Sequence, residues 1–212
     1  MSGSLVSPET RARIRGWMTP IALAFGKVGL TPNALTLIGF GIAVIAAVAA
    51  AAQAWVIAGL LVVFGGVFDL FDGALARATN TVSKLGAFMD STFDRWGEGV
   101  VYVGIVVGAL NADLRLAAIF ATAAMVSAFM VSYTRAKAES LGFAPGTGMA
   151  NVGLAPREIR IVILTIGLIV AGLAPGSPAL EIALGLIAVL ATITVIQRIL
   201  VTINQASNQE QG

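Results

Sequence analysis

The sequence predicts an all-α integral membrane protein with six transmembrane helices and an N-terminal amphipathic helix at the membrane interface. Of its 212 residues, 58% are hydrophobic and only 11% are charged, whereas a soluble domain carries about 25% charged residues. The mean hydropathy is +0.91. Apolar stretches of about 20 residues, the length that crosses a bilayer as a helix, follow one another between Pro, Gly, Asn or charged residues. The bilayer is therefore the expected solvent.

The first element expected lies ahead of these stretches, over residues 8–30. Three arginines alternate there with small and apolar residues, and larger apolar residues follow them. This pattern is typical of a helix that lies on the membrane surface, and we expect a break at Pro20 because proline removes a helical hydrogen bond. The arginines are Arg11, Arg13 and Arg15, and the apolar residues are Trp17, Ile21, Leu23 and Phe25.

Six spans follow, of which the first is free of charge and the second, third and fourth contain charged residues. We expect an interfacial segment over 1–30, one membrane domain over 31–203 and a flexible polar tail over 204–212. The spans are expected at 33–52, 54–76, 84–109, 114–138, 158–174 and 179–202.

The lysines and arginines predict the orientation of these spans. With six spans, the N-terminal segment, the connections after the second and fourth spans and the C-terminus share one side, and only Arg115 lies near the other. Because basic residues favour the cytoplasm, both termini and the active site are expected to face it, in a multi-pass protein of the cell membrane. The basic residues on that side are Arg11, Arg13, Arg15, Lys27, Arg77, Lys84, Arg135, Lys137, Arg157, Arg160 and Arg198.

Composition also limits the chemistry. The chain has no cysteine and no histidine, which excludes thiolate chemistry and the commonest general base. The formal charge is only +2, and we expect no nucleic-acid partner. Catalysis must therefore depend on carboxylates, basic side chains or hydroxyls.

The second and third spans contain two pairs of aspartates, Asp69 with Asp72 and Asp90 with Asp94. Spacings of three and four residues place each pair on one face of a helix. Carboxylates are costly inside a membrane, and divalent ions such as Mg²⁺ or Mn²⁺ offset that cost well. Four carboxylates match two such ions, an arrangement suited to phosphoryl chemistry.

Two alternatives remain open for these aspartates. They could form buried ion pairs with Arg77, Lys84 and Arg95, or they could line the ion pathway of a transporter. Glu98 lies one turn beyond Asp94 and either extends the acidic site or pairs with Arg95 or Lys84.

The residues around the aspartates resemble a known signature. Asp69-x-x-Asp72-Gly73-x-x-Ala76-Arg77, eight residues, and then Gly86-x-x-x-Asp90-x-x-x-Asp94 is similar to the motif of the CDP-alcohol phosphatidyltransferases. The resemblance implies six transmembrane helices, a homodimer and a polar cavity that opens to the cytoplasm. It also implies a reaction in which an acceptor hydroxyl attacks the β-phosphate of a CDP-linked lipid and CMP leaves.

The same resemblance implies roles for individual residues. The metal ligands are Asp69, Asp72, Asp90 and Asp94, and Asp94 is also the general base. The CDP-diacylglycerol-type lipid is bound by Asn33, Asp69, Gly73, Ala76, Arg77 and Gly86. The stretch Leu30-Thr-Pro-Asn33 also reads as an ordinary helix start, with Thr31 as cap and Pro32 in the first turn.

Basic residues in the last three spans suggest a phosphorylated acceptor. They resemble segments of the phosphatidylinositol phosphate synthases of actinobacteria and related archaea, which implies inositol 1-phosphate as the acceptor. Arg135 stands where those enzymes have lysine, and either Arg157 or Arg160 fills the position in the fifth span. The expected phosphate-binding residues are Arg135, Lys137, Arg157, Arg160 and Arg198.

Other acceptors and one other function fit less well. Glycerol 3-phosphate suits the basic residues nearly as well as inositol phosphate, whereas serine has no phosphate for them to bind. A divalent-cation transporter would need a polar path on both sides of the site, yet the outer halves of the spans, such as 100–109 and 37–52, are almost wholly apolar.

Overall fold

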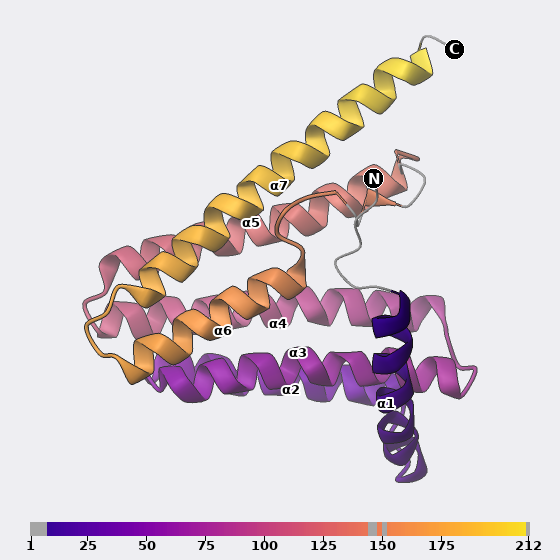
Figure 1. Ribbon diagram of the computed structural model, residues 1–212, viewed down its shortest axis with the longest axis horizontal. Helices are drawn as coiled ribbons and strands as arrows, with labels where there is room; N and C mark the ends of the chain where they lie inside the picture. Colours follow the sequence, from indigo (N-terminus) through magenta and orange to yellow (C-terminus); the bar gives the residue numbers. More distant parts are fainter. Residues whose placement is uncertain (1–7, 144–147, 150–151, 211–212) are drawn as a thin grey trace.

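The computed structural model describes residues 8–143, 148–149 and 152–210, and no strand forms within these ranges. Over these residues the chain forms a bundle of seven helices, shown in Figure 1. In order they are α1 (Pro8–Lys27), α2 (Pro32–Ala51), α3 (Trp55–Ala78), α4 (Lys84–Asn111), α5 (Arg115–Ser140), α6 (Arg157–Leu173) and α7 (Ala179–Glu210).

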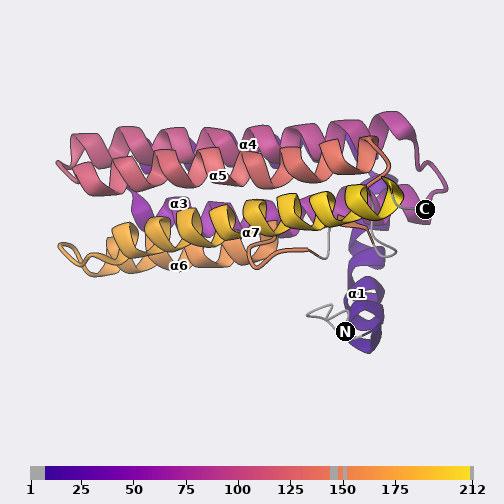
Figure 2. The same cartoon turned by 90° about the horizontal axis from the view of Figure 1, so that it is seen from above.

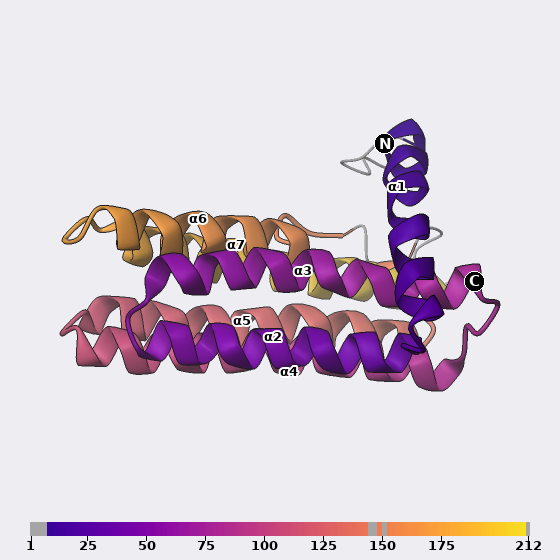
Figure 3. The same ribbon diagram turned by 90° about the horizontal axis from the view of Figure 1, so that it is seen from below.

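Helices α2, α3 and α4 run along one another, α5 and α6 are tilted against them and α7 is tilted the most, while α1 lies across one end of the bundle (Figures 1 and 3). Successive helices reverse direction. The connections after α3 and α5 therefore lie at the α1 end, with the C-terminus, and those after α2, α4 and α6 lie at the opposite end (Figure 2). The charged ends of α3, α4, α5 and α6, which include Arg77, Lys84, Lys137 and Arg157, thus gather at one end of the molecule.

The boundaries of α2 to α6 match the expected spans to within a few residues. Among the described residues, four helices are long and apolar enough to cross a membrane by themselves: α2, α3, α5 and α7, the last over Ala179–Asn208. Helix α4 carries the charged residues of the motif, and α6 has only 17 residues. Both nevertheless run beside the other four.

Two local expectations were wrong. Helix α1 continues through Pro20 rather than breaking there. Its C-terminal half is held by packing, since Ala22 and Phe25 contact the Phe68 cluster of α3. Helix α7 continues to Glu210, so that the tail expected to fray from residue 204 is helical up to that point. The side chains of Arg11, Arg13 and Arg15 lie outside the described part of the chain.

Helix ends are defined by residues in the left-handed backbone region. One such residue follows each of α1 to α6: Gly29, Gln53, Asn80, Asp113, Gly142 and Gly176. This conformation satisfies the last carbonyl groups of a helix and turns the chain back. The start of α2 is capped as expected, because the Thr31 hydroxyl accepts a hydrogen bond from the Ala34 amide at 3.2 Å.

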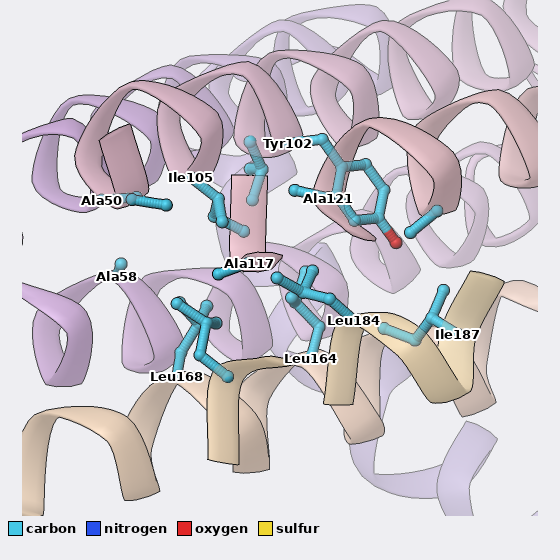
Figure 4. Packing of buried hydrophobic residues seen from close by; sticks show 14 of the residues in the cluster. Ala50, Ala58, Tyr102, Ile105, Ala117, Ala121, Leu164, Leu168, Leu184 and Ile187 are labelled. Atoms are coloured by element: carbon cyan, nitrogen blue, oxygen red, sulfur yellow. The ribbon is translucent and has the colours of Figure 1, made fainter. Parts of the chain in front are cut away.

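Small residues let the helices approach closely. A Cβ atom added to Gly104 or Gly108 of α4 would lie 2.2 Å from the Ala47 carbonyl oxygen or 2.0 Å from that of Ala50. Close helix contacts of this kind are typical of membrane bundles. Between the helices, alanines and leucines from α2 to α7 form the main core, part of which is drawn in Figure 4.

Candidate active site

The four aspartates of the motif line one cavity of about 410 Å³. Asp69 and Asp72 reach it from α3, and Asp90 and Asp94 reach it from α4. Although they share the cavity, no group of three or more carboxylates in the described residues lies close enough together to hold a metal ion. The donor atoms are nevertheless the oxygen ligands that Mg²⁺ and Mn²⁺ prefer.

A guanidinium group stands between two of these carboxylates. Arg157, the first residue of α6, donates from Nη2 to Asp69 Oδ2 at 2.8 Å and from Nη1 to Asp94 Oδ2 at 2.9 Å. A cation from a third helix, α6, therefore offsets the electrostatic cost of burying the Asp69 and Asp94 carboxylates. The expected alternative of ion pairing is realised in part, but with Arg157 instead of Arg77, Lys84 or Arg95.

Asp72 is fixed by α2. Its Oδ2 accepts a hydrogen bond from the Thr36 hydroxyl at 2.7 Å, and its Oδ1 accepts one from the Gly73 amide. The residue is only 6% exposed. Two hydrogen bonds hold this carboxylate in one orientation at the cavity wall.

The position of the Asp69 carboxylate depends on the absence of a side chain at Gly39. A Cβ atom on Gly39 of α2 would lie 2.5 Å from Asp69 Oδ1, well inside van der Waals contact. Any larger residue at position 39 must therefore displace the carboxylate. The sequence offered no signal for this role, because Gly39 lies outside the motif.

Five of the six residues expected to bind the CDP-lipid line a second cleft, of about 480 Å³, whereas Asp69 lines the first cavity. Asn33, Gly73, Ala76, Arg77 and Gly86 all contribute to it, together with Asp72 and Asp90. The guanidinium of Arg77 lies over Gly73, 3.1 Å from where a Cβ atom would be. Because Asp72, Gly73, Arg77 and Asp90 also line the first cavity, the two hollows meet at the carboxylates.

Four of the five expected phosphate-binding residues line the first cavity: Arg135, Arg157, Arg160 and Arg198. Lys137 is exposed near the end of α5 and is not among the residues that line it. Arg135 pairs with Glu139 at 3.1 Å. Arg198, only 4% exposed, donates from Nε to the Val152 carbonyl at 3.0 Å and from Nη1 to the Val131 carbonyl.

Arg160 is occupied by a structural contact. It is 2% exposed and donates to both oxygens of Glu98, at 2.9 and 2.8 Å, and to the Ala155 carbonyl at 2.8 Å. The expectation that Glu98 pairs with Arg95 or Lys84 was therefore wrong. The bidentate pair joins α6 to α4 next to the cavity.

The start of α6 is also held by a residue that the sequence did not single out. The Thr194 hydroxyl of α7 accepts hydrogen bonds from the amides of Leu154 and Ala155, both at 3.0 Å. Gly153 packs against the same threonine, with φ +123° and no room for a Cβ atom. These contacts place Arg157 at the carboxylates.

A scan against protein families matches residues 29–202 to the CDP-alcohol phosphatidyltransferases. The chain belongs to this family. The match spans α2 to α6 and most of α7, including both hollows.

Curated relatives and a solved structure agree with this family. The chain is 36% identical over 191 residues to archaetidylinositol phosphate synthase of Pyrococcus horikoshii, covering 90% of this chain and 93% of that protein. It is 36% identical over 197 residues to phosphatidylinositol phosphate synthase of Cutibacterium acnes, covering 86% and 92%.

Crystal structures of Mycobacterium tuberculosis phosphatidylinositol phosphate synthase have the same fold. The form with CDP-DAG bound gives a TM-score of 0.79 at 31% identity, covering 87% of this chain and 92% of that one. A form of that protein with manganese and citrate gives 0.78. This chain is thus a multi-pass membrane transferase of phospholipid synthesis that depends on a divalent metal.

Proposed function

We propose that this transferase moves the phosphatidyl group of CDP-diacylglycerol, or of an ether-linked analogue, to the hydroxyl of inositol 1-phosphate. One observation carries the proposal: a single cavity is lined by the four aspartates of the motif and by six arginines, among them Arg135, Arg157, Arg160 and Arg198. The carboxylates suit metal-assisted phosphoryl transfer. The arginines suit a second substrate that carries its own phosphate.

The reaction joins the acceptor oxygen to the β-phosphorus of the CDP-lipid. The bond from this phosphorus to the CMP oxygen breaks, and CMP leaves with its electron pair. The proton of the acceptor hydroxyl passes to the carboxylate of Asp94, which acts as general base. Asp69, Asp72, Asp90 and Asp94 would hold two Mg²⁺ or Mn²⁺ ions, which would supply positive charge to the reacting phosphates.

The CDP-lipid belongs in the second cleft. Asn33, Gly73, Ala76, Arg77 and Gly86 surround the cytidine diphosphate, and Asp69 contributes from the first cavity. Small residues at 73, 76 and 86 let phosphates approach the backbone, and the Arg77 guanidinium is suited to hold a phosphate oxygen. Because the two hollows meet at the carboxylates, a phosphate bound there is accessible to an acceptor in the first cavity.

The acceptor phosphate belongs with Arg157 and Arg198, while Arg135 lines the outer part of the pocket. Arg160 serves as a support, because Glu98 and Ala155 use its donors. The similarity of the chain to archaetidylinositol and phosphatidylinositol phosphate synthases favours inositol phosphate. Glycerol 3-phosphate, which would give phosphatidylglycerol phosphate, is the second candidate because it presents the same phosphate to the same arginines.

A divalent-cation transporter is disfavoured by the bundle interior. A separate hollow lined by Asp69, Asp94 and Glu98 has a volume of only about 50 Å³. It has room for no more than a few waters. Past Tyr102, the described part of the core is packed with apolar residues such as Ile105 and Leu168 (Figure 4).

We place the protein in the cytoplasmic membrane with all six helices α2 to α7 spanning it and α1 on the cytoplasmic surface. The domain boundaries proposed are 1–30 for the interfacial segment and 31–203 for the membrane domain, and residues 204–210 continue α7. The end of the bundle that carries α1, the C-terminus and the basic ends of α3, α4, α5 and α6 faces the cytoplasm. A homodimer remains the assembly proposed, and light scattering of the detergent-solubilised protein tests it.

The acceptor is tested by release of CMP from the purified protein. CDP-diacylglycerol and Mg²⁺ are supplied with inositol 1-phosphate, glycerol 3-phosphate, inositol or serine in separate reactions. Release with inositol 1-phosphate alone supports the proposal. Release with glycerol 3-phosphate alone means that glycerol 3-phosphate, not inositol 1-phosphate, is the acceptor. Release with serine or free inositol contradicts the assignment of the arginines to an acceptor phosphate.

A further inference from the structure

The two carboxylates that Arg157 bridges come from different helices. Asp69 lies on α3 and Asp94 on α4, and each gives its Oδ2 atom to one terminal nitrogen of the same guanidinium. These are two of the four residues proposed to hold metal ions. The guanidinium therefore occupies ligand atoms that a divalent ion needs.

The side chain of Arg157 is held by fewer hydrogen bonds than that of Arg160, which lies one turn further along α6. Its Nε is buried and has no hydrogen-bond partner, and its side chain is 22% exposed to the cavity. Arg160, by contrast, donates from all three nitrogens and is 2% exposed. A side chain with an unpartnered donor and an open cavity beside it can change rotamer without moving the helix.

The backbone under Arg157 stays in place during such a change. The Arg160 pair with Glu98 and the Thr194 hydrogen bonds to Leu154 and Ala155 hold the start of α6 from both sides. Movement is then confined to the arginine side chain. The same cavity contains Arg135 and Arg198, so that a released guanidinium remains among groups suited to an anion.

We propose that Arg157 is the resident counter-ion of the carboxylate site, which a divalent ion displaces, and that the released guanidinium then binds the acceptor phosphate. The second half rests on the proposed function. A guanidinium and a divalent ion repel each other and compete for the same oxygens. Metal and acceptor phosphate should therefore bind with positive coupling, and the metal should bind first.

The first half is tested by metal binding alone. Mn²⁺ affinity is measured by electron paramagnetic resonance on the purified protein, without lipid or acceptor. Arg157→Gln removes the competing cation, and we expect its Mn²⁺ dissociation constant to fall by about tenfold, within the usual range of coupling between sites. An unchanged or larger dissociation constant overturns the counter-ion role.

Arg135→Gln is the matched control. It removes one positive charge from the same cavity, but Arg135 pairs with Glu139 and not with Asp69 or Asp94. We expect its Mn²⁺ affinity to stay close to that of the wild type. An equal gain in both variants shows that overall charge, rather than occupation of the ligands, sets the affinity, and contradicts the proposal.

Arg157→Lys provides a second variant if Arg157→Gln does not fold. Lysine keeps the charge but lacks the planar fork that reaches two carboxylates. Its Mn²⁺ affinity should lie between those of the wild type and Arg157→Gln. Affinity equal to the wild type contradicts displacement of a bridging contact.

The second half is tested with inorganic phosphate as the probe. In the wild type and in Arg135→Gln, Mn²⁺ should strengthen phosphate binding, and in Arg157→Gln this gain should be lost. Coupling that persists undiminished in Arg157→Gln overturns the transfer of Arg157 to phosphate. Because neither arm uses CDP-lipid or inositol phosphate, failure of the proposed acceptor in the CMP assay remains a separate result.

Discussion

Asp94 lies between the other carboxylates of the cavity and the arginine at the start of α6. Its carboxylate lines the same cavity as Asp69, Asp72 and Asp90, and it faces α6 through its contact with Arg157. Of the two motif aspartates on α4, it is the one that pairs with Arg157, one of the acceptor-side arginines. This placement suits a base that receives a proton from an acceptor bound near those arginines.

Replacement of Asp94 by asparagine should stop turnover. Asn keeps the size of the side chain but cannot accept the proton at the same rate, and general bases typically contribute about 10²- to 10⁴-fold. We expect CMP release by Asp94→Asn to fall by at least about a hundredfold, with CDP-lipid binding changed little. An active Asp94→Asn variant contradicts the assignment of Asp94 as the base. Binding of a labelled CDP-lipid distinguishes loss of the chemical step from loss of substrate binding.

Gly39 gives a sharper test of geometry. Alanine at this position places its Cβ 2.5 Å from Asp69 Oδ1, so that the carboxylate must shift. We expect Gly39→Ala to lower both Mn²⁺ affinity and CMP release by about tenfold or more, since displacements near 1 Å are costly in catalysis. Thermal unfolding should change little, because the atom displaced is the end of a side chain.

Gly41→Ala is the matched control for this variant. It lies two residues further along the same helix, and a Cβ atom there meets nothing within 4 Å. Its activity should match the wild type. Equal losses in both variants mean that helix α2 itself is sensitive to alanine, and that the Asp69 contact is not the cause.

At the scale of elements, the start of α6 is the part on which the site depends most. It brings Arg157 to carboxylates that lie 88 and 63 residues earlier in the chain. Its own position is set by α4 through Glu98 and by α7 through Thr194. Of these two supports, the ion pair of Glu98 with Arg160 is the easier to probe, because one substitution removes its charge.

Glu98→Gln should destabilise the bundle strongly. The change leaves the Arg160 guanidinium buried with one charged partner removed, a loss that typically costs about 3–5 kcal/mol. Thermal unfolding in detergent measures it, with Glu139→Gln as the comparison. Glu139 pairs with Arg135 at the surface, and such pairs contribute about 1 kcal/mol or less. Similar losses in the two variants contradict the support role of Glu98.

The sequence was enough to predict the helices, because apolar runs with polar interruptions define spans almost directly. It was also enough to bring Asp69, Asp72, Asp90 and Asp94 to one cavity, since spacing along a helix determines its faces. Partners across the bundle could not be predicted in this way. That Arg157 reaches the aspartates and Arg160 reaches Glu98 depends on how α6 packs against α3 and α4, and no local pattern encodes that packing.

At the scale of the whole molecule, charge is distributed along the bundle axis. The motif, the acceptor-side arginines and the charged ends of α3 to α6 lie toward the end crossed by α1, while the described core toward the other end is apolar (Figures 1 and 4). A membrane protein built in this way can react with a soluble phosphate ester at one surface while holding lipid chains among its helices.

The orientation of the bundle can be measured cleanly because the chain has no cysteine. Ala52 follows α2 and Ser140 ends α5, at opposite ends of the bundle, and both are exposed. With a membrane-impermeant maleimide on intact cells, Ala52→Cys should be labelled and Ser140→Cys should not. Labelling of Ser140→Cys without permeabilisation contradicts a cytoplasmic active site.

The measurement that tests the central claim most directly is mass spectrometry of the lipid formed by the purified protein. The reaction contains CDP-diacylglycerol, inositol 1-phosphate and Mg²⁺, and Asp94→Asn and a chelator serve as controls. We predict that phosphatidylinositol phosphate and CMP appear in equal amounts, and that both controls abolish them. CMP without the phosphoinositide product, or a product that forms with Asp94→Asn, would contradict transfer at this carboxylate cavity.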